Sequence, residues 1–140
     1  MGIDRSWLKL GAIGLLDAVA TKHPLGHQPD KAQRYVLTTR EHACVEIMLE
    51  KNAESPMNLW CLQSAAGTDL IRDLKPKLSL SAKLRTSYGK NGKLQYGRHS
   101  ALEKMDQLGE ADLVCFAPET LRQLGQIIDR LQSVRPIDLL

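Results

Sequence analysis

The sequence predicts an α+β fold: one small domain with a mainly antiparallel sheet, helices at the N- and C-termini and a basic β-hairpin. Two apolar stripes at helical spacing lie near the ends of the chain, and short alternating runs separated by turn residues fill its middle. These runs follow one another as local hairpins, which favours an antiparallel sheet over a doubly wound parallel one. At 140 residues, of which 43% are hydrophobic, the chain can bury a core without metal or disulfide bonds, so residues 1–140 are expected to form a single globular domain.

The N-terminal part is expected to be a helix over residues 4–21. Its apolar stripe has the spacing of one helical face and comprises Leu8, Ala12, Leu15, Leu16 and Val19. Lys9 and Asp17 fall outside this stripe, which makes the helix amphipathic. Residues 22–31 contain two prolines, a glycine and an aspartate, a composition that predicts a loop.

Three strands are expected next, over residues 34–39, 43–50 and 57–62. The first is rich in β-branched and aromatic residues, and the second alternates apolar side chains with polar ones. This alternation predicts one buried face and one half-wetted face, and the wetted face carries Glu46 and Glu50. The turn-forming residues that follow predict that the second and third strands pair as an antiparallel hairpin.

The middle of the chain continues with a short helix and a segment of ambiguous pattern. Residues 64–74 are expected to be helical, and Pro76 prevents the helix from extending. The pattern of residues 77–83 fits a strand as well as one helical turn.

A hairpin is expected around Asn91-Gly92, because a two-residue type I′ turn requires positive φ at both central residues. The register that follows pairs Lys90 with Lys93, Tyr88 with Gln95 and Thr86 with Gly97. Two lysines opposite each other across a strand pair repel, and a bound polyanion would remove that repulsion.

The C-terminal part is expected to contain a helix, a strand and a second helix. Ser100 and Glu103 match a capping box, which predicts a helix over residues 101–108. Residues 111–116 form a short buried strand, and Pro118 opens the last helix. The apolar stripe of that helix is the most regular in the chain and comprises Leu121, Leu124, Ile127, Ile128 and Leu131.

The charge of the chain is unevenly distributed. Residues 75–98 carry seven of the 19 lysines and arginines, and no acidic residue lies between Asp73 and Glu103. The rest of the chain therefore holds 12 basic residues against all 16 acidic ones. A basic segment that also carries tyrosines is typical of a surface that binds phosphate groups and supports a base or sugar.

The sequence gives little support for a metal or catalytic site. A proline and a glycine separate His23 from His27, so the two cannot share a helical face, and His42 with Cys44 has no further ligand nearby. The acid-x-lysine sequence at residues 73–75 falls at a predicted helix end, where a nuclease site would not form. A nucleophile elbow and a glycine-rich phosphate loop are absent. We expect no cofactor, no metal and no catalytic residue, although an enzyme with an unrecognised site stays an alternative.

Cysteine usage and hydropathy indicate an intracellular protein. Cys44, Cys61 and Cys115 share no close spacing and lie in apolar runs, so each is expected to be a packed free thiol. No apolar run is long enough to cross a bilayer, and the N-terminal residues do not resemble a cleavable signal. These features predict a cytoplasmic location and no membrane contact.

The sequence therefore predicts a small nucleic-acid-binding domain, with duplex DNA slightly preferred because only 4% of the residues are aromatic. The residues expected to contact nucleic acid are Lys75, Lys77, Lys83, Arg85, Tyr88, Lys90, Lys93, Tyr96 and Arg98. The alternative is a protein-interaction or inhibitor module, such as an accessory, anti-defence or antitoxin-like protein, whose basic face docks on a protein partner. A basic segment that is merely solvated explains the charge equally well. The sequence leaves the oligomeric state open.

Overall fold

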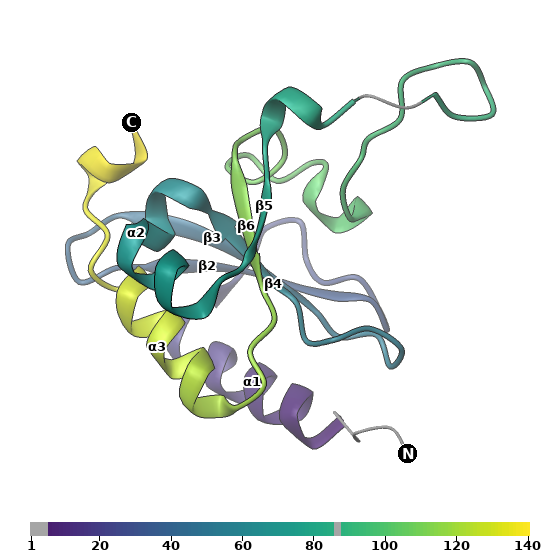
Figure 1. Ribbon diagram of the computed structural model, residues 1–140. Helices are drawn as coiled ribbons and strands as arrows, with labels where there is room; N and C mark the ends of the chain where they lie inside the picture. The colour runs from purple at the N-terminus through teal and green to yellow at the C-terminus, as the bar shows by residue number, and fades with distance from the viewer. Residues whose placement is uncertain (1–5, 86–87) are drawn as a thin grey trace.

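The computed structural model describes residues 6–85 and 88–140, which form an α+β fold around one six-stranded sheet (Figure 1). In chain order the elements are α1 (Ser6–Val19), β1 (Thr21–Lys22), β2 (Ala32–Thr38), β3 (Cys44–Glu50), β4 (Leu59–Leu62), α2 (Gln63–Leu74), β5 (Lys77–Ser79), β6 (Leu113–Phe116) and α3 (Leu121–Leu131). Three 3₁₀ turns accompany them: η1 (Ser81–Lys83), η2 (Ser100–Leu102) and η3 (Pro136–Leu139). The strands lie in the order β1-β2-β3-β4-β6-β5, and all neighbours are antiparallel. This arrangement confirms the predicted fold class.

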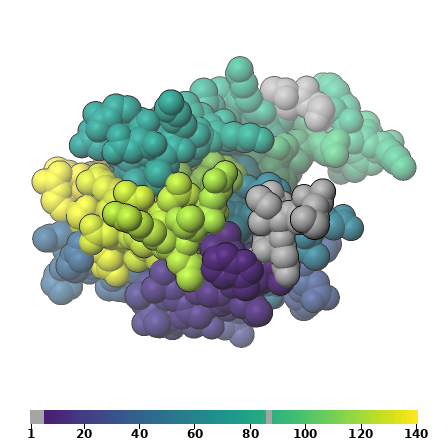
Figure 2. Space-filling model, turned by 60° about the horizontal axis from the view of Figure 1, so that its bottom comes forward, coloured from purple at the N-terminus to yellow at the C-terminus, as the bar shows by residue number. Residues whose placement is uncertain are grey.

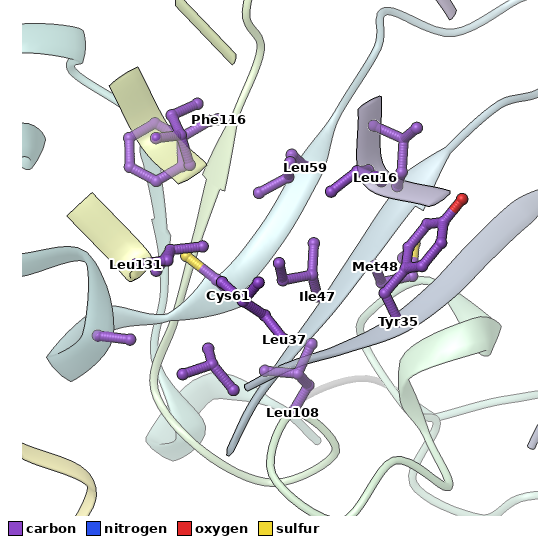
Figure 3. Packing of buried hydrophobic residues seen from close by; sticks show 14 of the residues in the cluster. Leu16, Tyr35, Leu37, Ile47, Met48, Leu59, Cys61, Leu108, Phe116 and Leu131 are labelled. Atoms are coloured by element: carbon purple, nitrogen blue, oxygen red, sulfur yellow. The ribbon is translucent and has the colours of Figure 1, made fainter. Parts of the chain in front are cut away.

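The helices and an irregular segment cover opposite faces of the sheet (Figure 1). On the face covered by α1, α2 and α3, Tyr35, Ile47 and Phe116 from the strands meet Leu16 and Leu131 from the helices in the core (Figure 3). On the other face lie residues 99–110, here named the cover segment. Its buried apolar side chains are Ala101, Leu102, Met105 and Leu108.

The central strand β3 is buried on both faces, so the prediction of a half-wetted face was wrong. Glu46 and Glu50, placed on the wetted face by their alternation, are only 7% and 8% exposed. Glu46 lies under the cover segment, and Glu50 accepts a hydrogen bond of 2.7 Å from the indole Nε1 of Trp60 on β4. Alternation along one strand separates its two faces, but it does not show what covers each of them.

The helix predicted over residues 101–108 is reduced to the 3₁₀ turn η2, followed by further turns. The expected capping box does not form, since His99 Nδ1 accepts the Ala101 N–H at 3.0 Å in place of the Ser100 side chain. A Cβ at Gly109 would lie 2.8 Å from the carbonyl oxygens of Glu103 and Met105, so the chain turns tightly there. Contacts with β3, described below, outweigh the local helical preference.

α1 begins within the described residues at Ser6; Asp4 and Arg5, where the predicted helix started, lie outside them. Lys9 was expected outside the apolar stripe but is buried, and its ammonium group donates to the carbonyl oxygens of Asn52 and of Ser55 (2.7 Å to the latter). Val19, predicted inside the stripe, is exposed. These two carbonyl groups explain how a lysine can lie on the buried side of the helix.

The remaining elements agree with the sequence except in detail. Residues 77–83, whose pattern fitted a strand or a helical turn, contain β5 followed by η1. α2 bends at Gly67, where φ is 77°, and the Arg130 guanidinium lies against this glycine and donates to the Ala66 carbonyl at 3.1 Å. α3 carries its predicted apolar stripe into the core, although Leu121 at its start stays partly exposed.

The three cysteines are free thiols, as predicted, but they are not equally packed. Burial raises the pKa of Cys61 and of Cys115 to about 12 in each case. Cys44, expected to be packed, is exposed at the first position of β3.

Candidate nucleic-acid interface

The described residues 84–85 and 88–98, here named the arm, project from the end of the sheet as an extended loop (Figure 1). Near its tip Tyr88 and Leu94 form an isolated antiparallel bridge, and the Gly89 N–H donates to the Lys93 carbonyl at 2.8 Å. Between these residues only Gly92 has positive φ (75°), and the Asn91 side chain accepts the Lys93 N–H at 3.1 Å. This is the three-residue loop with a glycine bulge rather than the two-residue type I′ turn.

The hairpin register inferred from the sequence is therefore wrong by one residue. Tyr88 faces Leu94 instead of Gln95, and Lys93 faces Gly89 instead of Lys90. Thr86, predicted to pair with Gly97, lies outside the described residues. A shift of one residue changes the partner of every residue in the pair, and Lys93 lies opposite Gly89, so the repulsion expected between two paired lysines does not arise.

Two of the residues expected to bind nucleic acid fasten the base of the arm to the cover segment. The Arg85 guanidinium forms a bidentate pair with Glu110 at 2.7 and 2.8 Å, and this hydrogen bonding lowers the pKa of the Glu110 carboxyl. The guanidinium carbon also lies 5.5 Å from the centre of the Tyr96 ring. The Tyr96 hydroxyl donates to the Gly109 carbonyl at 2.8 Å, and burial raises its pKa. Glu110 thus neutralises Arg85 locally.

Arg98, a third expected contact residue, is held inside the fold by backbone oxygen atoms. Its guanidinium donates to the Ser79 side chain and carbonyl at 2.8 and 2.9 Å and to the Ala111 carbonyl at 2.5 Å. Longer hydrogen bonds reach the carbonyl groups of Leu108 and Gly109. Arg98 therefore joins β5, the cover segment and the residue Ala111 that precedes β6.

Replacing Arg98 with alanine is expected to lower the free energy of unfolding by about 3 kcal/mol, because several partly buried carbonyl groups lose a charged donor. Urea unfolding measures this change, and Lys93→Ala is the control, expected to change stability by less than about 0.5 kcal/mol. An Arg98→Ala protein of unchanged stability and reduced nucleic-acid affinity would instead assign the guanidinium to ligand binding.

The five lysines of the basic segment have a different environment, and together they are named the lysine ridge: Lys75, Lys77, Lys83, Lys90 and Lys93. All five are exposed, and none takes part in an ion pair within the described residues. Lys75 caps α2 in the left-handed region (φ 49°), Lys77 begins β5, and Lys83 ends η1. The remaining two lie on the tip of the arm. In Figure 1 the backbone segments that carry these lysines are the end of α2, the edge strand β5, η1 and the tip of the arm.

Apolar side chains accompany the ridge. Tyr88 is 71% exposed and pairs with Leu94 on the arm, while Leu78 and Leu80 are exposed along and after β5. Tyr88 thus offers a flat, accessible ring on the same loop as Lys90 and Lys93, as expected for contact with a base or sugar.

At its other end the ridge borders a hollow of about 500 Å³. Lys75, Lys77, Asn58 and Cys115 contribute to its lining, and none of the described lining residues carries a carboxylate. Burial keeps the Cys115 thiol protonated at neutral pH, since its pKa is raised to about 12. The hollow therefore places two lysines next to neutral polar groups, while the Glu50 carboxylate lies close enough to Cys115 to raise the pKa of its thiol as well.

A buried histidine–glutamate contact was not foreseen from the sequence. His23 Nε2 lies 2.6 Å from Glu46 Oε2, while its Nδ1 accepts the Leu25 N–H at 3.0 Å. Since Nδ1 accepts a hydrogen bond, Nε2 carries the ring proton and donates a hydrogen bond to the carboxylate. Both ring nitrogens are thus occupied, and the pair supports the fold rather than a reaction. The only sign of this contact in the sequence was a glutamate within a strand of mainly apolar residues.

Metal and membrane sites find no support in the part of the chain that the structure describes. No group of three or more His, Cys, Asp or Glu side chains there could hold a metal ion. The described helices are also too short or too polar to cross a membrane.

Comparisons with models of known protein families, with curated proteins and with solved structures found no match to this chain.

Proposed function

We propose that this protein binds nucleic acid through the lysine ridge, with duplex DNA as the slightly preferred form, inside the cell. The observation that carries this proposal is the set of five exposed lysines without ion-pair partners among the described residues, arranged along an edge strand and a projecting arm. An ammonium group that is not paired within the protein remains available to a phosphate.

The internal contacts narrow the set of residues that serve binding. Arg85 and Arg98 have charge or hydrogen-bond partners within the fold, and the Tyr96 hydroxyl is also engaged. In the proposed mode these three hold the arm in place, whereas the lysines contact phosphates and Tyr88 supports a base or sugar. Phosphate contacts of this kind position a protein on the backbone without reading sequence.

The Lys90→Glu, Lys93→Glu double variant tests the proposal. Fluorescence anisotropy with a labelled duplex at about 0.1 M salt is expected to show affinity reduced about 50-fold or more, because two phosphate contacts are lost. A labelled single strand serves as the second ligand. The matched control is Lys22→Glu, Lys31→Glu, which makes the same change of charge on exposed lysines, with Lys22 on β1 at the opposite edge of the sheet. Equal losses in both variants would contradict a site on the arm.

A second candidate function, docking on a protein partner, is favoured by the exposed apolar side chains of Leu78, Leu80 and Leu94 along the same ridge. In this accessory, anti-defence or antitoxin-like role, the lysines would steer the encounter with an acidic partner. The wild-type protein would then bind neither the duplex nor the single strand, and that result would overturn the first proposal.

A further inference from the structure

The outer side of α1 is unusually apolar for a helix at the surface. Trp7 is 61% exposed and Leu10 is 70% exposed, and Gly14 and Ala18 continue the same stripe at spacings of three, four and four residues. This stripe lies opposite the core stripe of Leu8, Ala12 and Leu16. A helix that is apolar on both sides is typical of one that packs on both sides.

The neighbouring surface of α3 extends the stripe. Leu121 packs on α1, since its Cδ1 lies 3.0 Å from where a Cβ of Gly11 would stand. One turn later Gly125 again leaves open space around its backbone, as Gly14 does on α1: no atom lies within 4 Å of a Cβ built at either position. Figure 2 shows the two helices side by side on this face, α1 in purple and α3 in yellow-green. The face therefore combines large exposed side chains with bare helix backbone.

The lack of charge on the exposed stripe of α1 limits the kinds of partner that can bind it. The two charged side chains of α1 both point to partners within the fold: Lys9 donates to backbone carbonyls, and Asp17 accepts from the Tyr35 hydroxyl at 2.7 Å. The exposed stripe of α1 thus offers no charge to nucleic acid, to an acidic protein or to anionic lipid headgroups. The partner must present an uncharged apolar helix face with complementary large and small positions.

We propose that this partner is a second copy of the chain, and that the protein forms a two-fold dimer through α1. In an antiparallel pair with its axis between residues 10 and 11, residue i faces residue 21 − i of the other copy. Trp7 of each copy then lies over Gly14 of the other copy, and the two Leu10 side chains lie next to each other at the axis, since Gly11 is already covered by Leu121 of its own chain. A large side chain meets a glycine on both sides of the axis, so the face is complementary to itself, as a two-fold interface requires.

The glycine at residue 14 adds a second argument. Glycine inside a helix destabilises it by about 0.5–1 kcal/mol relative to alanine, and apart from its chain neighbours and its own helix backbone no described atom lies within 4 Å of a Cβ built there. In the dimer the indole of Trp7 from the second copy would occupy that space, which explains why a glycine stands at residue 14. This inference does not depend on nucleic-acid binding.

Sedimentation velocity from about 1 µM to about 300 µM tests the dimer. The mass of the wild-type protein is expected to rise from 15.6 kDa towards twice that value with concentration. Leu10→Glu is expected to remain monomeric at every concentration, because the dimer would bury the new carboxylate. Ile137→Glu is the matched control: Ile137 is 64% exposed on η3, and this variant is expected to dimerise like the wild type.

Gly14→Leu separates association from folding. A Cβ at this position meets no atom within 4 Å outside its own helix backbone and chain neighbours, and leucine replaces a poor helix former, so thermal unfolding is expected at the same or a higher temperature. The same side chain collides with Trp7 of the second copy, so dimerisation is expected to be lost. A wild-type protein that stays monomeric at the highest concentration would overturn the proposal. A dimer that survives Leu10→Glu or Gly14→Leu, or is lost in Ile137→Glu, would do the same.

Discussion

Binding to duplex DNA is expected to weaken about 500-fold when the salt concentration rises from about 50 to about 200 mM. Each phosphate neutralised on a duplex releases counterions, so the logarithm of affinity falls against the logarithm of salt concentration with a slope of about −0.9 per contact. The lysine ridge offers five ammonium groups without ion-pair partners in the described chain, which gives a slope of about −4.5. Anisotropy titrations at four or more salt concentrations measure this slope.

The same titrations show which cations take part. The Lys90→Glu, Lys93→Glu variant is expected to give a slope of about −2.7, since three lysines remain. If Arg85 and Arg98 also contacted phosphates, the wild-type slope would approach about −6.3. A slope near zero with measurable affinity would show that phosphates are not the ligand, and it would contradict the proposed function.

Replacing Glu46 with alanine is expected to lower the free energy of unfolding by about 4 kcal/mol. The carboxylate of Glu46 accepts the backbone N–H groups of Gln107 (2.7 Å) and Leu108 (3.1 Å) as well as the proton on His23 Nε2. Alanine would leave these three donors without an acceptor in a buried place. This loss is a large fraction of the 5–15 kcal/mol, roughly, by which a domain is stable. Because Glu46 holds the cover segment, that segment is expected to loosen before the rest of the domain unfolds.

Urea unfolding of three variants, each compared with the wild-type protein, checks this prediction. Glu46→Gln keeps one acceptor oxygen and is expected to lose about 2 kcal/mol, half of the alanine effect. Glu54→Ala, at an exposed position, is the control and is expected to lose less than about 0.5 kcal/mol. Equal stability of Glu46→Ala and Glu54→Ala would mean that the Glu46 carboxylate does not hold the cover segment in solution.

Much of the fold could be predicted because its elements have strong local signals. The stripe of α3, the alternation in β3 and the short apolar run of β6 each give an element of the correct type. The failures share one physical cause. The cover segment, the buried face of β3 and the inward-pointing Lys9 are all fixed by residues distant in sequence, such as Gln107 for Glu46 and Asn52 for Lys9. Periodicity does not contain such contacts.

The candidate interface was predictable in composition but not in geometry. Counting charges located the basic segment, yet it could not separate Arg98, which binds backbone carbonyls, from Lys93, which is exposed. The turn predicted at Asn91-Gly92 also placed Lys90 opposite Lys93. Asn91-Gly92 fits two kinds of hairpin turn, and the two differ by one residue in register. Glu110 lies outside the basic segment, so its pairing with Arg85 had no local signal.

The side chain of Gln107 takes the place of a missing strand. β3 pairs with β4 only at Met48 and Leu49, and beyond that point the amide of Gln107 donates to the Cys44 carbonyl and accepts the Glu46 N–H. The amide proton of Glu46, although central in the sheet, is therefore protected from exchange with solvent by a loop residue. Its hydrogen-exchange rate should report how often the cover segment lifts from the sheet, without any probe being added to the protein.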